Sequence, residues 1–271
     1  MKKIGILGSE DSYSYLCYQK FIEKTHLILE PVFYRTMHET FKHYTELDFL
    51  ILPFENTLEG YVQQHMDLLF THQLVIEAEL TLPISFDYIY KNQVKNLYVQ
   101  YVTKNQCLSF IEDHHAYQIV LTDSNSESLE RYQHDPFGSA IIPHHLNQSK
   151  EQSLLDVADE TSNHTRFLVL AQKPLGLTRY ERFDDYKISL VITPYKDRPG
   201  LLFDILKEFA EEKVNLISIM SRPTKKQLGT YHFFIELISN EKDDMKTVHI
   251  LERLKIDFDV RVLGFYQVLY I

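Results

Sequence analysis

The stretch NHTRFLVL, residues 163–170, places an amide, an imidazole, a hydroxyl and a guanidinium directly before an apolar segment. Residues 167–170 have the composition of a buried strand. Polar groups at the mouth of a buried strand are costly to desolvate unless a ligand or a partner uses them. Because open α/β sheets bind ligands at strand ends, we expect a functional site where this strand begins.

Composition narrows the class of protein. The chain has 271 residues, of which 44% are hydrophobic, enough for one large domain or two smaller ones. A net charge of −10 with scattered basic residues argues against a nucleic-acid partner. Cys17 and Cys107 lie far apart without a CxxC pair, which favours a reducing compartment. No run approaches the roughly 18 apolar residues of a membrane span, and the first apolar stretch is too short for a signal peptide, so we expect a cytoplasmic protein with no membrane partner.

The first half of the chain alternates short apolar runs with amphipathic stretches, which indicates a sheet covered by helices. A strand is expected at residues 3–7, followed by a helix behind Ser12 as N-cap, and a capping box begins at Thr36. Residues 48–54 predict a buried strand that delivers ENTLEG, residues 55–60, at a strand-to-helix turn. The long extended segment 74–90 suits a crossing between two lobes. The second lobe is predicted to contain strands near 97–102, 119–122 and 139–143.

The last part of the chain has a different order of predicted helices and strands. Residues 172–186 contain Pro, Gly and charge without an apolar period, so they predict a linker with a domain boundary near Lys187. Beyond it the pattern is βαββαβ, the ferredoxin-like unit. Its helices are expected at 200–212 and 243–254, and its strands at KISLVIT, VNLISIM, TYHFFIEL and near 260–266.

Taken together, residues 4–266 resemble the prephenate dehydratase family. NHTRFLVL resembles its Thr-Arg-Phe signature, LPFENTLEGYV resembles its Glu-Asn-Ser-x-x-Gly motif, and the last unit resembles a phenylalanine-binding ACT domain. The resemblance implies an α/β fold: a two-lobed, periplasmic-binding-protein-like catalytic domain at 1–178, and a ferredoxin-like βαββαβ ACT domain at 187–271. No chorismate mutase helix bundle is expected before the first strand, so the resemblance implies a monofunctional enzyme.

The implied reaction converts prephenate to phenylpyruvate in phenylalanine biosynthesis. The ring carboxylate leaves as carbon dioxide and the opposite hydroxyl leaves as water, so the site must hold two anions and donate a hydrogen bond to the leaving hydroxyl. The reaction needs no metal or organic cofactor. Thr165 suits the donor role because its hydroxyl is neutral. Arg166 either clamps a carboxylate or pairs with a glutamate to brace the wall, since strand alternation points it away from Thr165. Phe167 either lines the ring pocket or belongs to the core.

The ENTLEG segment supplies a second group of site residues. Asn56 and Thr57 can donate to a carboxylate at a helix start, where free backbone amides also point. Gly60 allows close backbone approach or a positive φ. Glu59 either orients Asn56 or serves as an acidic residue in the first turn of the helix.

Serines at expected helix starts complete the predicted substrate site. Ser12, Ser14 and Ser124 each serve equally well as an N-cap or as a substrate ligand. Glu10 and Asp11 bring two carboxylates into a loop that has none in the family pattern, and we expect Asp11 to turn outward and cap the helix. The adjacent pairs His114–His115 and His144–His145 lack the HExxH spacing, so they are expected at the surface and no metal site is predicted.

The ACT resemblance implies an allosteric phenylalanine site at a subunit interface, within a homodimer or homotetramer. DRPGLLF and MSRP stand where the family has Gly-Ala-Leu-Val and Glu-Ser-Arg-Pro, with Met220 in place of the glutamate. The implied effector residues are Pro199, Gly200, Leu201, Leu202, Ser221, Arg222 and Pro223.

Two other functions stay open at this point. An arogenate dehydratase would need an acidic partner for the ammonium group of its substrate, and Glu10 or Asp11 could supply one. A catalytically decayed phenylalanine sensor would explain the missing glycine of the first loop. Retention of Thr165, Arg166 and Asn56 opposes decay.

Overall fold

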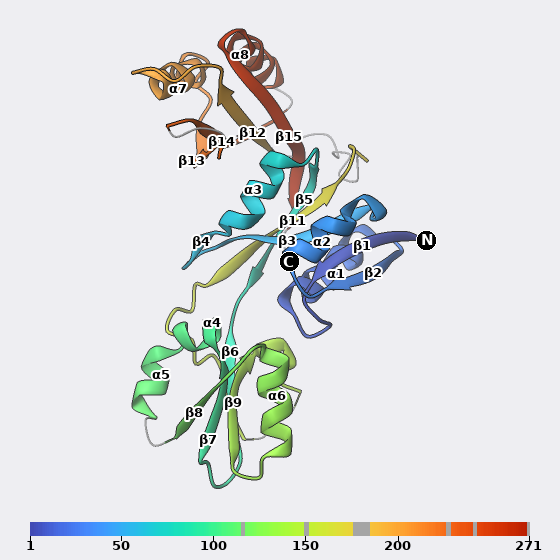
Figure 1. Ribbon diagram of the computed structural model, residues 1–271, viewed down its shortest axis with the longest axis vertical. Helices are drawn as coiled ribbons and strands as arrows, with labels where there is room; N and C mark the ends of the chain where they lie inside the picture. Colours follow the sequence, from blue (N-terminus) through green and yellow to red (C-terminus); the bar gives the residue numbers. More distant parts are fainter. Residues whose placement is uncertain (115–116, 149–151, 176–184, 226–228, 241–242, 270–271) are drawn as a thin grey trace.

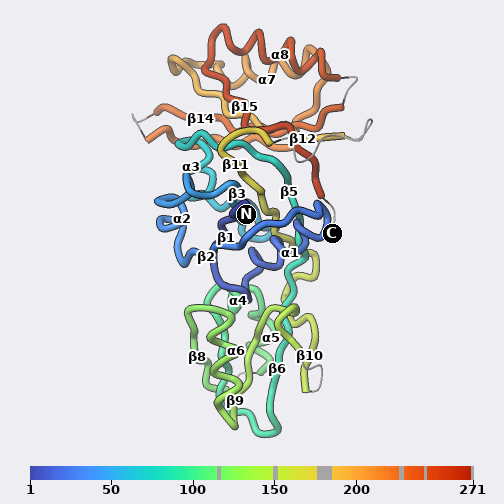
Figure 2. Tube along the Cα trace, turned by 90° about the vertical axis from the view of Figure 1, so that its right-hand side faces the viewer, coloured from blue at the N-terminus to red at the C-terminus, as the bar shows by residue number. Residues whose placement is uncertain are grey.

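Three units are stacked along the long axis of the molecule (Figure 1). The computed structural model describes residues 1–114, 117–148, 152–175, 185–225, 229–240 and 243–269. The first α/β lobe lies in the middle, with the second lobe at one end and the C-terminal unit at the other, and the view turned by 90° shows the same order (Figure 2). The predicted two-lobed α/β architecture with a separate C-terminal unit is confirmed. Among the described residues, no helix has the length and apolar composition needed to cross a membrane.

The first lobe is built around a sheet whose strands combine two directions. Its elements are β1 (Lys2–Leu7), α1 (Tyr13–Thr25), β2 (Leu29–Tyr34), α2 (Met37–His43), the short helix η1 (Tyr44–Glu46), β3 (Phe49–Asn56), β4 (Gly60–Tyr61), α3 (Gln63–Thr71), β5 (Val75–Pro83) and β11 (His164–Ala171). β1 pairs in parallel with β2 and β3, whereas β11 is inserted antiparallel between β3 and β5. The predicted caps are present, because the side chains of Ser12 and Thr36 accept from the backbone amides of Tyr15 and Glu39.

The second lobe has its own five-stranded sheet. It contains β6 (Phe86–Tyr90), β7 (Asn96–Gln100), α4 (Tyr101–Asn105), α5 (Leu108–Asp113), β8 (Gln118–Thr122), α6 (Asn125–His134), β9 (Gly138–Pro143), η2 (His144–Leu146) and β10 (Ser153–Leu154). The chain enters this lobe between β5 and β6, as the extended segment 74–90 predicted, and returns to the first lobe at β11. The strand expected near 97–102 stops at Gln100, because its side-chain oxygen accepts from the amides of Val102 and Thr103 and starts α4.

The ENTLEG segment differs from its prediction. It forms a hairpin rather than a strand-to-helix turn: Asn56 and Gly60 face each other across β3 and β4, and α3 begins only at Gln63. The Asn56 side-chain oxygen accepts from the amide of Leu58, and Gly60 adopts φ +73°, which closes the turn. The free amides of a helix start are therefore not next to Asn56.

The C-terminal unit has the predicted βαββαβ order. It consists of β12 (Tyr186–Pro194), α7 (Leu201–Glu211), β13 (Leu216–Pro223), β14 (Tyr231–Ser239), α8 (Asp244–Asp257) and β15 (Phe258–Leu269). Both helices pack on one face of the sheet around a core that includes Ile188, Ile205 and Leu254 (Figure 1). Most of the predicted linker, 172–186, lies outside the described residues.

The sheets of the first lobe and the C-terminal unit are continuous. β15 pairs with β12 along most of its length, and its last residues, Gln267–Leu269, pair in parallel with β5. Gly264 pairs with Ser189 of β12 shortly before β15 changes partner, and a Cβ atom there would approach the backbone oxygen of Ile76 to 2.3 Å. Only a residue without a side chain permits this close approach.

Gly264→Ala is expected to lower the free energy of unfolding by about 1–3 kcal/mol, because the added methyl group forces β15 away from the backbone of β5. Denaturant unfolding of parent and variant measures the effect. An unchanged midpoint would show that the approach of the two strands is not needed for stability.

Candidate active site

The centre of the candidate site is a pair of side chains on neighbouring strands. Asn56 at the end of β3 lies directly opposite Thr165 at the start of β11. The Asn56 Nδ2 donates to the Thr165 hydroxyl oxygen at 3.0 Å, and the Asn56 Oδ1 accepts from the amides of Leu58 and Glu59. These bonds fix the orientation of the Asn56 amide. Since the Thr165 oxygen accepts from an amide, its own hydrogen is directed to a different acceptor.

This pair is linked to the second lobe by two further amides. Asn56 Nδ2 also donates to Oδ1 of Asn163 at 2.8 Å, and Nδ2 of Asn163 donates to Oε1 of Gln106 at 2.8 Å. Asn163 is 1% exposed, and Gln106 ends α4 in the second lobe. The hydrogen-bond chain therefore connects Thr165 with both lobes. Sequence reasoning missed Gln106; its position beside the buried Cys107 was the available signal.

The other residues of ENTLEG have structural surroundings that differ from those expected. The Thr57 hydroxyl donates to the carbonyl of His164 and accepts from its amide, so both functions of this hydroxyl are used by the backbone of β11. Glu59 is exposed in the hairpin and precedes α3, so it is not in the first turn of a helix. Gly60 lies opposite Asn56 and has a positive φ, which is one of the two roles predicted for this glycine.

The predicted serines lie at two helix starts that come from different lobes. Ser12 caps α1 and Ser124 caps α6, whereas Ser14 lies inside the first turn of α1 and is buried. Ser9 before α1 and Ser126 in α6 approach each other, with 3.4 Å between their hydroxyl oxygens. Two helix N-termini therefore meet across the lobes, an arrangement that favours anions.

The loop before α1 corrects two expectations. Ser12, not Asp11, provides the cap; the backbone carbonyl of Asp11 instead accepts from Nε2 of His145 at 3.0 Å. His145 is half-buried rather than fully at the surface, since its ring packs 4.7 Å from that of Tyr13 and burial lowers its pKa. His144 contacts the buried carboxylate of Asp87. Of the other predicted pair, His115 lies outside the described residues. No group of three or more metal-ligating side chains occurs in the part of the chain that the structure describes.

Arg166 and Phe167, which follow Thr165 on β11, are both occupied by contacts within the protein. Phe167 is 1% exposed and packs in the core beneath α1, which assigns it to the core rather than to a ring pocket. The register of β11 shifts at this point against β3 but not against β5, so the irregularity lies in β3 at Phe54, and Phe167 stays on the Thr165 side of β11.

The Arg166 guanidinium contacts three carboxylates instead of an open site. Its distances are 2.8 Å to Glu55, 2.7 Å to Glu236 and 3.3 Å to Glu79. Burial acts to lower the pKa of Arg166, but Glu236 and Glu79 outweigh it and raise that pKa above its ordinary value. Burial raises the pKa of Glu55, and Arg166 opposes the rise. This geometry corresponds to bracing, the second of the two roles considered for Arg166.

The predicted effector residues are only partly brought together. Pro199, Gly200 and Leu202 are exposed around the start of α7, where Gly200 has φ +82°, and Leu201 is buried. Ser221 and Pro223 are exposed on β13. Arg222 points the other way and pairs at 2.9 Å with Asp67 of α3, so within this protomer it contacts the first lobe.

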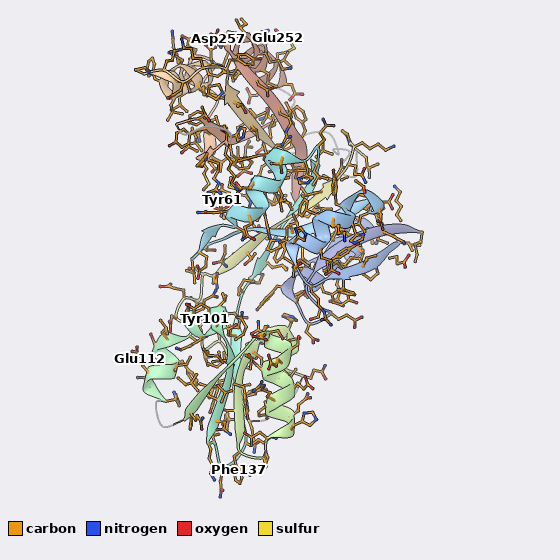
Figure 3. The ribbon with its side chains drawn as sticks, viewed as in Figure 1. Tyr61, Tyr101, Glu112, Phe137, Glu252 and Asp257 are labelled. Carbon is orange, nitrogen blue, oxygen red and sulfur yellow. The ribbon has the colours of Figure 1, made fainter. Side chains whose placement is uncertain are left out.

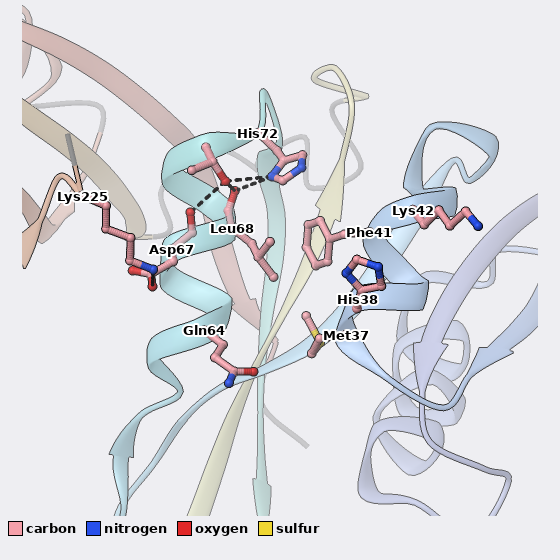
Figure 4. A pocket seen from close by; sticks show the side chains of 10 residues that line it. Met37, His38, Phe41, Lys42, Gln64, Asp67, Leu68, His72 and Lys225 are labelled. Carbon is pink, nitrogen blue, oxygen red and sulfur yellow. Dashed lines mark hydrogen bonds and ion pairs between the residues drawn. The ribbon is translucent and has the colours of Figure 1, made fainter.

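A cavity of about 590 Å³ lies between α2 and α3 and is bordered by Lys225 of the C-terminal unit (Figure 4). Phe41 and Leu68 provide apolar walls, and Asp67 pairs with Lys225 at its edge. None of the residues that line it was predicted as a site residue.

The fold and the site define a two-lobed α/β catalytic domain followed by a ferredoxin-like module. A family model described as prephenate dehydratase matches residues 4–175, and an ACT domain model matches residues 193–255. The chain therefore belongs to the prephenate dehydratase family, and its C-terminal unit is an ACT domain.

Individual relatives agree with this assignment. The prephenate dehydratase of Methanocaldococcus jannaschii is 29% identical over 89% of this chain and 90% of its own length. The solved prephenate dehydratase of Staphylococcus aureus is 27% identical, with a TM-score of 0.79 over 98% of this chain and 100% of its own. The Arthrobacter aurescens enzyme, solved in complex with L-Phe, shares the fold at 24% identity, with a TM-score of 0.79 over 98% of this chain and 89% of its own.

Thr165→Val is expected to lower kcat by about 10²-fold, because it removes the hydroxyl and keeps the side-chain volume. The melting temperature should change little, since Asn56 Nδ2 keeps Asn163 and the His164 carbonyl as acceptors. Thr165→Ser should retain part of the activity. Parental turnover by the valine variant would remove Thr165 from the donor role.

Proposed function

We propose that this chain converts prephenate to phenylpyruvate, with Thr165 as the hydrogen-bond donor to the leaving hydroxyl. The observation that carries the proposal is the bond from Asn56 Nδ2 to the Thr165 oxygen at 3.0 Å. It leaves the hydroxyl hydrogen of Thr165 for the substrate. A neutral donor also suits an anionic substrate, because it assists departure without adding a charge that must first be neutralised.

The two carboxylates of prephenate require positive potential that the chain provides without a metal. The starts of α1 and α6 come from opposite lobes, and Ser9 and Ser126 bring them together. Backbone amides at helix starts bind carboxylates and are strengthened by the helix dipole. Arg166 is excluded from this role by its three carboxylate partners, so it supports the strand that carries Thr165. Asn56 orients Thr165, while Thr57 holds the backbone of His164.

Phenylalanine is the proposed allosteric effector. Gly200 and the exposed start of α7 offer backbone amides to an amino-acid carboxylate, and Ser221 is exposed on β13. Met220 packs toward the first lobe, so it does not replace the family glutamate as a partner for an ammonium group. The A. aurescens relative binds L-Phe.

Assembly, compartment and domain boundaries complete the proposal. Large apolar side chains are exposed on α7 and β13, namely Leu202, Phe203, Ile217 and Ile219, and a homodimer or homotetramer would cover them. The two free, buried cysteines suit the cytoplasm. The catalytic domain spans 1–178 and the ACT domain 187–271.

Arogenate is the alternative substrate that one observation favours. Glu10 is exposed and Asp11 is half-exposed in the loop before α1, where a carboxylate could meet the ammonium group of arogenate. Prephenate has no such group, so these carboxylates would give it no contact. The two substrates therefore differ in whether they present a positively charged group to this loop.

Purified protein should release phenylpyruvate from prephenate faster than phenylalanine from arogenate, and phenylalanine should bind by calorimetry and slow the first reaction. Chromatography separates the two products. Preferential conversion of arogenate would reassign the substrate. Phenylalanine binding without turnover of either substrate would identify a sensor.

A further inference from the structure

Glu236, on β14 of the ACT domain, is fully buried and accepts hydrogen bonds from both domains. Within the ACT domain, Ser189 and Tyr266 donate to it at 3.0 and 3.1 Å. From the first lobe, Arg166 donates to both carboxylate oxygens at 2.7 and 2.9 Å, and the Tyr61 hydroxyl donates at 3.2 Å. One carboxylate therefore contacts side chains from four strands, β12 and β15 of the ACT domain and β4 and β11 of the first lobe.

Both first-lobe partners of Glu236 are covalent neighbours of the candidate site. Arg166 follows Thr165 on β11, and Tyr61 follows Gly60, which faces Asn56 across the hairpin. Neighbouring residues of a strand point to opposite faces of the sheet. Glu236 thus contacts β11 on the face opposite to Thr165, and it contacts β4, which pairs with the strand that carries Asn56.

The same tyrosine reaches the ACT strand that carries the proposed effector residues. The Tyr61 hydroxyl lies 2.6 Å from the Ser218 hydroxyl on β13, and Ser221 follows three residues later. Figure 3 labels Tyr61 near the junction of the first lobe and the ACT domain. The Tyr61 ring also lies 5.8 Å from the Arg166 guanidinium. A shift of β13 relative to β14 would therefore change the contacts of Tyr61 and Arg166 together.

We propose that Glu236 is a positioning residue, which couples the ACT sheet to the Asn56–Thr165 pair through Arg166 and Tyr61. The expected effect of this coupling on turnover rests on the proposed function. Its expected effect on the stability of β4 and β11 does not. Effector binding would alter the reaction by moving these contacts, since a ligand acts at a distance only by favouring one of two arrangements. A buried charge cluster suits this role because losing one partner leaves the others uncompensated.

The test compares Glu236→Gln with Asp67→Asn, a matched control. Asp67 also forms ion pairs across the interface, to Arg222 and Lys225, and neither of these partners lies on β4 or β11. Glu236→Asp, which keeps the charge, should restore part of any loss. Tyr61→Phe removes one hydroxyl and keeps the ring, so this variant tests the same coupling if Glu236→Gln fails to fold.

Hydrogen exchange, which needs no substrate, is the first measurement. Glu236→Gln should speed exchange at least about tenfold in peptides covering residues 54–61 and 163–168. Tyr61→Phe should speed exchange in the same peptides to a smaller extent. Asp67→Asn should leave their exchange at the parental rate. Equal exchange in parent and Glu236→Gln, or equal acceleration by Asp67→Asn, would overturn the coupling.

Kinetics with prephenate is the second measurement. Glu236→Gln should lower kcat by about 10- to 10²-fold with less than about a twofold change in KM, and phenylalanine should still bind by calorimetry but inhibit less. Unchanged inhibition by bound phenylalanine would contradict the proposal. Parent protein that does not convert prephenate would refute the proposed function alone, because the exchange result still decides the coupling.

Discussion

The antiparallel pairing of β3 with β11 is the constraint on which the rest of the structure depends. It sets Asn56 opposite Thr165 and Glu55 opposite Arg166 in consecutive positions. Because side chains alternate between the faces of a sheet, an amide–hydroxyl pair lies on one face and an ion pair on the other. Register is therefore critical here, since a shift of one residue would exchange the reactive face with the charged one.

The charged face forms part of the contact between the ACT domain and the first lobe. Arg166 and Lys187 stand among the carboxylates of Glu55, Glu79 and Glu236, with Lys187 Nζ 2.7 Å from Glu79. Burying such groups costs desolvation energy, so the cluster is weak evidence for stability. Its value is geometric, because Arg166 contacts carboxylates of both domains and so fixes β11 relative to β14. The continuous sheet formed by β15 and β5 holds that arrangement in place.

Local sequence patterns predicted much of the fold, whereas contacts between residues far apart in the sequence could not be predicted. Period and capping placed α1 behind Ser12 and gave the βαββαβ order, since these depend on neighbouring residues. ENTLEG was misplaced because its hairpin depends on Gly60 adopting a positive φ, which a helix start also tolerates. Gln106 was missed and Glu236 could not be found, since the side-chain partners that define their roles lie at least 30 residues away in the sequence. The family resemblance supplied the Asn56–Thr165 site; the direction of their hydrogen bond required coordinates.

The central claim, that Asn56 and Thr165 act as one unit, is tested most directly by a double-mutant cycle on the turnover of prephenate. Asn56→Ala and Thr165→Val each remove one side of the 3.0 Å hydrogen bond. If Asn56 works by aiming the Thr165 hydroxyl, each single variant should lower kcat by about 10²-fold and the double variant should lose little more. A double variant whose loss is the product of the two single losses would contradict the account, because it would show that the two side chains act independently.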